Sequence, residues 1–362
     1  MKKIHLIAAA RPNFMKIAPL YHALAKEPWC KPFIVHTGQH YDPNMSDAFF
    51  RDLRLPAPHF HLEVGSGSHA EQTGKVMIAY EKVAIAEKPD WIVVVGDVNS
   101  TVACAMVGAK LWIPVAHLEA GLRSRDRRMP EEINRLMTDA IADLLWTPSA
   151  DGDENLRAEG IPPERVECVG NIMIDSYEMM REAIEADGTR ALLGLQPRSY
   201  GVVTLHRPSN VDTRAALEPL VAQLLSAGEH LPLVFAVHPR TRKMLQSFDL
   251  LQSLEKAPSI HLIEPLGYVP FMNLVVGARA VITDSGGVQE ETTYLGIPCL
   301  TLRENTERPV TVTLGSNRLV TPATLVKELS SVLQIEGRLG QRPPLWDGHA
   351  AARVVASLKS RI

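Results

Sequence analysis

Short apolar runs alternate with longer amphipathic runs along almost the whole chain. Runs rich in Val, Ile and Leu, such as WIVVVG, predict strands at 4–9, 33–37, 91–96, 112–116, 144–147, 166–169, 201–205, 232–237, 260–263, 280–283, 298–302 and 318–320. Amphipathic runs predict helices, for example at 15–26, 70–87, 99–110, 131–142, 213–227, 288–295, 323–334 and 347–361. Continuously apolar strands between helices are typical of a parallel sheet that is covered on both faces.

The strand–helix pattern occurs twice, in two halves of similar length. It predicts an α/β protein of two doubly wound, Rossmann-like domains. We expect one domain over 1–170, joined by a C-terminal helix at about 347–362, and a second over 171–346. Ligands of such open sheets bind at the carboxyl ends of the strands. Two domains that face each other across these ends would form a central cleft.

Bulk composition changes this picture little. With 46% hydrophobic and 22% charged residues the chain resembles an ordinary globular protein, and its formal net charge of −3 predicts no nucleic-acid or anionic-membrane partner. The four cysteines are far apart and lack metal-binding spacing, which favours reduced thiols and a cytoplasmic location. The N-terminal apolar run is short and is followed at once by Arg11, so a buried strand is favoured over a signal peptide.

The segment HLEAGLRSRDRRMPEEINR, at 117–135, is the richest in candidate chemistry. It begins at the end of an apolar strand and ends in a predicted helix. Its acids Glu119 and Glu131, gathered with several arginines at a strand-to-helix loop, suit acid/base catalysis beside an anionic ligand. The alternative is a solvated loop whose Glu131 and Glu132 only complement the helix N-terminus.

Other polar residues also follow predicted strands. Asp97 comes after VVVG, and His206 and His238 come after the strands at 201–205 and 232–237. These positions favour ligand contact. Alternatively, Asp97 is a helix cap and each histidine is structural.

The segment VITDSGGVQEE predicts a strand, a tight turn and a helix. Ser285, Gly286 and Gly287 would let a phosphate approach the backbone N–H groups of the helix start. Glu291 on the first turn could accept both hydroxyls of a ribose, and Arg308 in RENTERP could bind a diphosphate. The alternatives are a tight turn without a ligand, a dipole partner and a solvated arginine.

The sequence argues against a redox cofactor. No G-x-G-x-x-G follows a strand, so NAD is not expected. No D-x-D pattern or Cys/His spacing indicates a metal, and we predict that the protein uses none. Arg11 and Lys16 after the first strand could instead bind a phosphate or carboxylate, although an exposed first helical turn is equally consistent.

The motifs together resemble the bacterial non-hydrolysing UDP-N-acetylglucosamine 2-epimerases. The resemblance runs in order, to about residue 320, through RPNFMKIAPL, GQHYD, GDVNST, HLEAGLRSRDRRMPEEINR, VGNIMID, TLHRPSN, ITDSGGVQEE and RENTERP. It implies a fold similar to the two-Rossmann GT-B glycosyltransferases. It also implies a UDP-sugar substrate, no cofactor, a homodimer, and a role in supplying precursors of cell-surface polysaccharides.

The resemblance assigns roles in the first half of the chain. It implies that Arg11 and Lys16 lie beside the diphosphate. It implies that Asp97, Glu119 and Glu131 belong to the acid/base and sugar-facing set.

In the second half, the resemblance adds His206 to that acid/base set and places Phe271 in the uracil pocket. The turn at 285–287 would hold phosphate, Glu291 the ribose, and Arg308 would complete the diphosphate site.

The chain departs from the family at three places. Ala9-Ala10-Arg11-Pro12-Asn13 stands where members often have GTRPE, and Leu266-Gly267 precede Tyr268 where some have glutamine. A regulatory Gln-His-Arg pattern reads Gln39-His40-Tyr41-Asp42. We therefore predict the same chemistry without activation by a second substrate molecule.

Epimerisation at C2 must remove a carbon-bound proton that has no adjacent carbonyl. Without NAD, the remaining route expels UDP from C1 as the C2 proton leaves, and UDP then adds back to the glycal after reprotonation. Four alternatives stay open: a hydrolysing 2-epimerase, a 2-epimerase of a diacetamido-uronic acid nucleotide, a retaining glycosyltransferase, and a non-catalytic nucleotide-sugar sensor.

Overall fold

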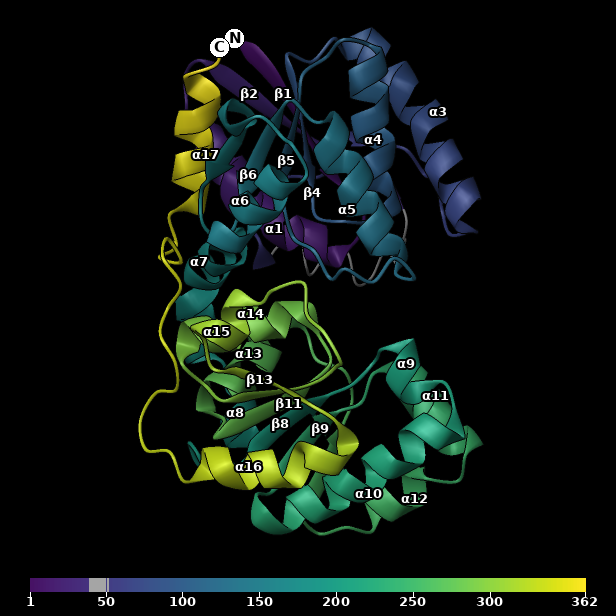
Figure 1. The fold of residues 1–362 in the computed structure, drawn as a ribbon, viewed down its shortest axis with the longest axis vertical. Helices are drawn as coiled ribbons and strands as arrows, with labels where there is room; N and C mark the ends of the chain where they lie inside the picture. The colour runs from purple at the N-terminus through teal and green to yellow at the C-terminus, as the bar shows by residue number, and fades with distance from the viewer. Residues whose placement is uncertain (39–49, 51) are drawn as a thin grey trace. The chain divides into compact units, whose positions relative to one another are not determined.

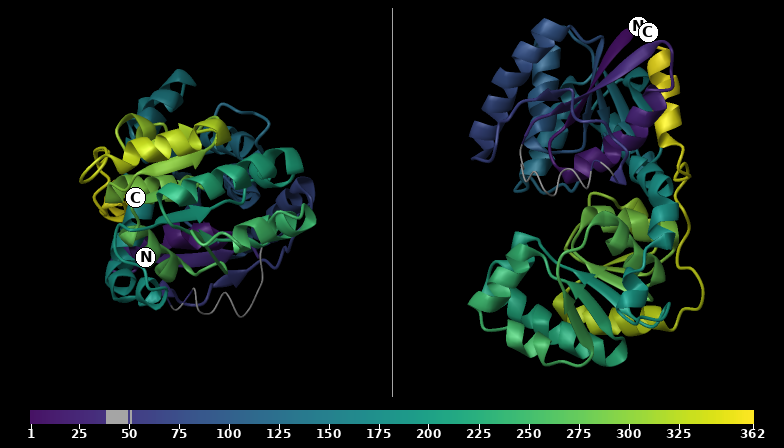
Figure 2. Two further views of the ribbon diagram at one scale, coloured as in Figure 1. Left: turned by 90° about the horizontal axis from the view of Figure 1, so that it is seen from below. Right: turned by 180° about the vertical axis from the view of Figure 1, so that it is seen from behind.

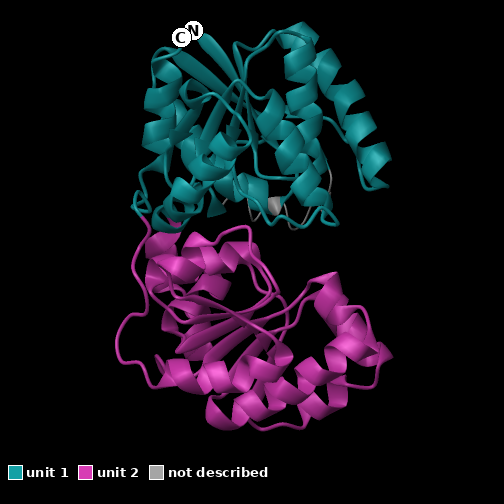
Figure 3. Ribbon diagram, in the orientation of Figure 1, with its two compact units in different colours: residues 1–179, 344–362 teal, residues 180–343 magenta. Residues whose placement is uncertain are grey.

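A computed structural model describes residues 1–38, 50 and 52–362. The chain forms two compact units (Figure 3): unit 1 contains residues 1–179 and 344–362, and unit 2 contains residues 180–343. The boundary expected at residue 170 lies just before helix α7 (Ile172–Ala186), and the compact units meet within that helix.

Unit 1 is built on a seven-stranded sheet of order β3-β2-β1-β4-β5-β6-β7, in which every pairing is parallel. Its strands are β1 (Lys2–Ala8), β2 (Cys30–His36), β3 (Phe60–His61), β4 (Trp91–Val95), β5 (Val115–Leu118), β6 (Leu144–Thr147) and β7 (Val166–Cys168). Strand β4, WIVVV, is buried at all positions, as expected for a strand covered on both faces.

Helices cover both faces of this sheet (Figure 1). The helices of unit 1 besides α7 are α1 (Arg11–Leu24), α3 (His69–Glu87), α4 (Asn99–Lys110), α5 (Pro130–Ile141), α6 (Ala150–Ala158) and α17 (Ala350–Lys359), with a 3-10 turn at Pro163–Arg165. Helix α17 returns from the end of the chain and packs against α1 (Figure 2). Trp146 anchors it, because its indole N–H donates to Ser357 Oγ at 2.9 Å.

Unit 2 is built on a six-stranded parallel sheet of order β10-β9-β8-β11-β12-β13. Its strands are β8 (Gly201–Thr204), β9 (Leu233–Ala236), β10 (Ile260–Ile263), β11 (Ala280–Thr283), β12 (Cys299–Leu302) and β13 (Asn317–Val320). Its helices are α8 (Thr189–Leu192), α9 (Pro208–Val211), α10 (Arg214–His230), α11 (Pro239–Ser247), α12 (Leu251–Glu255), α13 (Tyr268–Gly277), α14 (Gly286–Leu295), α15 (Val310–Thr313) and α16 (Leu325–Leu333), with a 3-10 turn at Pro322–Thr324.

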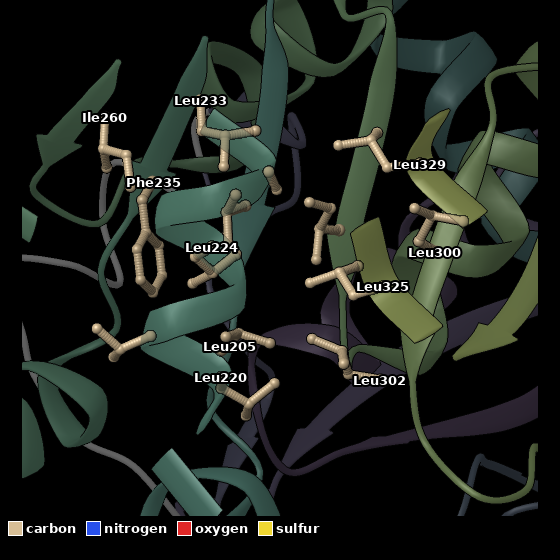
Figure 4. Close-up of a cluster of buried hydrophobic side chains, with 14 of the residues drawn as sticks. Leu205, Leu220, Leu224, Leu233, Phe235, Ile260, Leu300, Leu302, Leu325 and Leu329 are labelled. Carbon is tan, nitrogen blue, oxygen red and sulfur yellow. The ribbon is translucent and has the colours of Figure 1, made fainter. Parts of the chain in front are cut away.

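A leucine-rich core lies between this sheet and helices α10 and α16. Figure 4 shows Leu220 and Leu224 of α10 and Leu325 and Leu329 of α16 pointing toward side chains of the sheet, among them Phe235. These residues follow the i, i+4 spacing of an amphipathic helix face. The predicted α/β class with two parallel sheets is confirmed.

Two details of the strand prediction are wrong. The strand expected at 112–116 lies at Val115–Leu118, because Trp112 is 94% exposed with a φ of 58°, a conformation that ends the preceding helix rather than starting a strand. Strand β3 was not predicted, since its two residues are too short for a periodic signal. No helix among the described residues is long and apolar enough to cross a membrane.

Candidate active site

Two predicted acids of unit 1 follow neighbouring parallel strands. Strands β4 and β5 pair with Val95 opposite Leu118, so Asp97 and Glu119 come from the same edge of the sheet. Glu119 is 3% exposed and has a φ of 72°, a left-handed conformation that is uncommon outside glycine. Its carboxylate forms an ion pair with the Lys16 ammonium of α1. The structure therefore brings together two of the predicted site residues, Lys16 and Glu119, at this sheet edge.

Gly96 allows this close arrangement. Its φ is 69°, and a Cβ atom there would lie 3.3 Å from Lys16 Nζ and 3.4 Å from Glu119 Oε2. Its N–H donates to Leu118 O at 3.1 Å. A side chain at this position would both strain the backbone and press on the ion pair.

Asp97 is tied to helix α5. Its carboxylate pairs with the Arg135 guanidinium, and its backbone carbonyl accepts from Asn134 Nδ2 at 2.9 Å. The Asp97 side chain remains 32% exposed, whereas that of Arg135 is almost fully buried. The carboxylate is therefore held by one buried cation and still accessible to a ligand.

The two glutamates at the start of α5 differ in environment. Glu131 is exposed on the first helical turn, and its catalytic role stays a prediction. Glu132 is buried; it accepts from the N–H groups of Ser124 at 2.9 Å and Arg125 at 2.8 Å, and pairs with Arg135 at 2.7 Å. Glu132 thereby fixes the arginine-rich loop to the helix that holds Asp97.

Two predictions fall outside the description of unit 1. The side chain of Arg11, at the first position of α1, is not among the described residues, so its predicted contact with a diphosphate stays a prediction. The segment 39–42, which carries the interrupted regulatory pattern, also lies outside the described residues.

In unit 2, His206 is oriented by a buried carboxylate. Its Nδ1 lies 2.9 Å from Asp284 Oδ1, and Asp284 also accepts from the Arg207 N–H at 2.9 Å and from Asn210 Nδ2 at 3.1 Å. Burial opposes charge on Asp284, but His206 and these hydrogen bonds bring the pKa of Asp284 below its usual value. The His206 side chain is 41% exposed, so its other ring nitrogen can face a ligand.

His238 lies beside His206, with ring centroids 5.7 Å apart. Its Nδ1 accepts from the Arg240 N–H at 3.2 Å and caps helix α11. Burial, and secondly the neighbouring His206, lower the pKa of His238. The structural alternative therefore accounts for one ring nitrogen of His238, and its contact with the substrate stays a prediction.

The predicted phosphate turn lies at the start of α14. Ser285 is the N-cap residue, and Gly286 and Gly287 form the first helical positions. A Cβ at Gly286 would meet Arg308 Nη1 at 2.8 Å, whereas a Cβ at Gly287 would meet nothing within 4 Å. Gly286 therefore lets Arg308 approach the helix N-terminus, and Gly287 leaves space beside it.

Arg308 belongs to a buried charged cluster. Its Nε lies 2.7 Å from Glu290 Oε1 and its Nη1 2.5 Å from Glu307 Oε1, while Arg303 pairs with Glu307 at 2.7 Å. Burial disfavours the charge of Glu307, yet Arg308 and Arg303 hold the pKa of Glu307 well below its usual range. The guanidinium is thus held near the helix start by two carboxylates.

Glu291 has the opposite environment. It is 4% exposed, and burial raises its pKa to about 8, against a smaller lowering by a hydrogen bond with Tyr268. Tyr268 belongs to α13, where Phe271 is also partly buried. A buried carboxyl with a strongly raised pKa is a functional-site candidate.

Three supporting residues were missed from the sequence: Gly96, Arg135 and Asp284. Asp284 opens the turn that was identified as a phosphate site, directly after a buried strand, and this position could have marked it. Among the described residues, no group of three or more His, Cys, Asp or Glu side chains could hold a metal ion.

Comparison with known proteins identifies the family of this chain. A family model described as UDP-N-acetylglucosamine 2-epimerase matches residues 22–359. The UDP-N-acetylglucosamine 2-epimerase of Methanocaldococcus jannaschii is 41% identical over 98% of both chains. The UDP-2,3-diacetamido-2,3-dideoxy-D-glucuronate 2-epimerase of Pseudomonas aeruginosa is 37% identical, over 98% of this chain and 99% of that protein.

The fold matches as well. The crystal structure of the M. jannaschii UDP-GlcNAc 2-epimerase in complex with UDP-GlcNAc and UDP superposes with a TM-score of 0.90, at 42% identity over 99% of both chains. The UDP-GlcNAc-bound Neisseria meningitidis 2-epimerase gives 0.89 at 27% identity, over 99% of this chain and all of that one. This chain therefore belongs to the UDP-N-acetylglucosamine 2-epimerase family, a family of isomerases.

Proposed function

We propose that this protein interconverts UDP-N-acetylglucosamine and UDP-N-acetylmannosamine without hydrolysis. The observation that carries the proposal is the gathering of Asp97, Glu119 and Lys16 around Gly96 at one edge of the unit 1 sheet. Carboxylates and a cation at such an edge suit proton transfer next to an anionic leaving group. Family membership supplies the substrate class.

The proposed chemistry is an elimination followed by an addition. A carboxylate takes the C2 proton, the C–H electrons form a C1=C2 double bond, and the C1–O bond breaks with its electrons going to UDP. The glycal is then protonated at C2 on the opposite face, and a diphosphate oxygen of UDP re-forms the bond to C1. Asp97, Glu119, Glu131 and His206 are our acid/base set for these steps.

UDP must be stabilised as it leaves. In unit 2 we assign the diphosphate to the α14 N-terminus at Ser285–Gly287 and to Arg308, the ribose to Glu291, and uracil to the neighbourhood of Phe271. Free N–H groups at a helix start favour a phosphate, and the fixed guanidinium adds a bidentate donor. In unit 1 we assign diphosphate contacts to Arg11 and Lys16.

A second candidate substrate is a diacetamido-uronic acid nucleotide. The 37% identity to the P. aeruginosa 2-epimerase of such a sugar supports it. The reaction at C2 would be the same, so the two candidates differ in the groups at C3 and C6. Competition between the two UDP-sugars for turnover by the purified protein measures the preference directly.

Incubation with UDP-GlcNAc alone, followed by NMR, tests the proposed function. We expect UDP-ManNAc to accumulate to a constant ratio with UDP-GlcNAc. Free ManNAc with UDP would show a hydrolysing enzyme, and an unchanged substrate would contradict the proposal.

The product would serve as a precursor of cell-surface polysaccharide, and we expect a homodimer. Light scattering on the purified protein measures the oligomeric state. A monomeric mass near the 39.9 kDa of the chain would contradict the dimer.

A further inference from the structure

His117 is a fully buried histidine that the acid/base set does not include. It lies in β5, two residues before Glu119. Its Nδ1 is 2.6 Å from Asp139 Oδ1, and its Nε2 is 2.8 Å from the backbone oxygen of Gly96. A backbone carbonyl can only accept a hydrogen bond, so Nε2 must donate.

The Asp139 carboxyl contacts the His117 ring through one of its oxygens. Its other oxygen accepts from the Gly121 N–H at 3.0 Å and pairs with Arg123 Nη1 at 2.8 Å, so the carboxyl faces donors on every side. Burial alone would raise the pKa of Asp139, but His117 and Arg123 bring it below its usual value. The Asp139 carboxyl therefore anchors the His117 ring and holds its Nε2 toward Gly96 O.

Gly96 is therefore held by strand β5 through both of its backbone polar groups. Its N–H donates to Leu118 O at 3.1 Å, and its carbonyl accepts from His117. Gly96 directly precedes Asp97 and lies against the Lys16–Glu119 ion pair. A shift of the peptide group that joins Gly96 to Asp97 would change the position of Asp97 relative to Glu119.

We propose that His117 is a positioning residue: its buried ring, anchored by Asp139, donates from Nε2 to Gly96 O and fixes Asp97 relative to Glu119. It touches no substrate and acts only through the backbone. The proposal rests on the proposed function, because it assumes that both acids serve one reaction. A misplacement of about 1 Å in such a pair can cost about 10²-fold in rate.

His5 offers a matched control. It is also fully buried, lies in β1 of the same sheet, and contacts Tyr80 OH through Nδ1 at 3.1 Å. Burial lowers the pKa of His5 to about 4, so it is neutral at pH 7.5. Its position in β1 gives it no hydrogen bond to Gly96 among the described contacts.

The experiment compares His117→Gln with His5→Gln. We expect both variants to lose thermal stability, but only His117→Gln to lose kcat, by about 10²-fold, with KM within about threefold. Wild-type kcat in His117→Gln, or an equal loss of kcat in His5→Gln, would overturn the positioning role.

Nitrogen-15 NMR of the wild-type protein, with labelled histidine, tests the hydrogen bond to Gly96 O without relying on a variant that folds. We expect Nε2 of His117 to carry a proton. An unprotonated Nε2 in His117 would overturn the proposal. If wild-type protein leaves UDP-GlcNAc unchanged, the proposed function fails, while the same spectrum still decides whether Nε2 of His117 is a donor.

Discussion

The sheet edge of unit 1 and the start of α14 in unit 2 both bury carboxyl groups, with opposite results. Glu119 is 3% exposed and is paired with the Lys16 ammonium. Glu291 is 4% exposed, and its pKa is raised to about 8. Similar burial thus gives a paired carboxylate in one region and a neutral acid in the other. The positive partner, not burial alone, decides the charge.

The same contrast occurs within unit 2. Glu307 has two arginine partners and a lowered pKa, while Glu291 has Tyr268 and a neighbouring glutamate. The charged groups of the unit 1 sheet edge suit proton transfer and stabilisation of a leaving group. A neutral carboxyl such as that of Glu291 can donate a hydrogen bond to a ribose hydroxyl and also accept one from it. The two regions therefore fit the sugar chemistry and nucleotide binding that we propose for them.

The largest expected effect concerns the charged acids of unit 1. Asp97→Asn and Glu119→Gln should each lower kcat by about 10²-fold or more, because each removes a proton-transfer group. Glu131→Gln should do the same. UDP binding, measured by calorimetry, should change little in all three variants.

Asp126→Asn is the matched control for these variants. Asp126 lies in the same arginine-rich loop, where it pairs with the exposed Arg128, so its kcat should stay near wild type. Near-normal turnover in Asp97→Asn, Glu119→Gln and Glu131→Gln would refute the assignment of the acid set.

The next effect concerns the fixed arginine of unit 2. Arg308→Lys keeps a positive charge for Glu290 and Glu307 but loses the planar fork of donors. We expect the dissociation constant for UDP to rise about tenfold, by calorimetry. An unchanged UDP affinity, in a variant as stable as wild type, would place the diphosphate elsewhere.

The pH dependence of stability that Glu291 causes gives a sharper test of the contrast between Glu119 and Glu291. A carboxyl with a folded pKa of about 8 and an unfolded value near 4.5 binds its proton more tightly in the folded state, so stability falls as pH rises between these values. At pH 8, Glu291→Gln should raise the free energy of unfolding by about 4 kcal/mol and weaken UDP binding.

Urea titrations at pH 5 and pH 8 measure this difference. The gain from Glu291→Gln should be under about 1 kcal/mol at pH 5, because this pH lies only about half a unit above the pKa of the carboxyl in the unfolded chain. A variant that is less stable than wild type at pH 8 would show that Glu291 is charged and well paired in the folded protein.

The smallest effect concerns neutral buried histidines of unit 1. Burial lowers the pKa values of His5 and His36 to about 4. The unfolded chain therefore binds protons first as pH falls from about 6.5 to 4, and stability is lost over that window. Urea titrations between about pH 6.5 and 4 should show that His5→Gln loses less stability than the wild-type protein as pH falls. Parallel plots of stability against pH for the two proteins would show that His5 does not cause the loss.

The sequence was sufficient for the architecture because apolar strands and amphipathic helices have distinct periods. Strand β11 was predicted at 280–283 and observed at Ala280–Thr283. Strand β5 was displaced because Trp112 is apolar but lies exposed in a turn. Hydrophobicity alone cannot separate such a residue from a strand residue.

The site was predictable only in part. Asp97, Glu119 and His206 stand at strand ends, and strand ends can be recognised in a sequence. The roles of Arg135, Asp139 and His117 depend on contacts between different elements, which no local pattern encodes. The same holds for the pKa of Glu291, because its main cause is burial in the folded protein.

The route of epimerisation is tested most directly by running the reaction in D₂O. Elimination removes the C2 hydrogen and returns a proton from an exchangeable group, so UDP-ManNAc formed from UDP-GlcNAc should carry deuterium at C2 by NMR. Product that keeps its original C2 hydrogen would contradict the account and would point to oxidation elsewhere on the sugar ring.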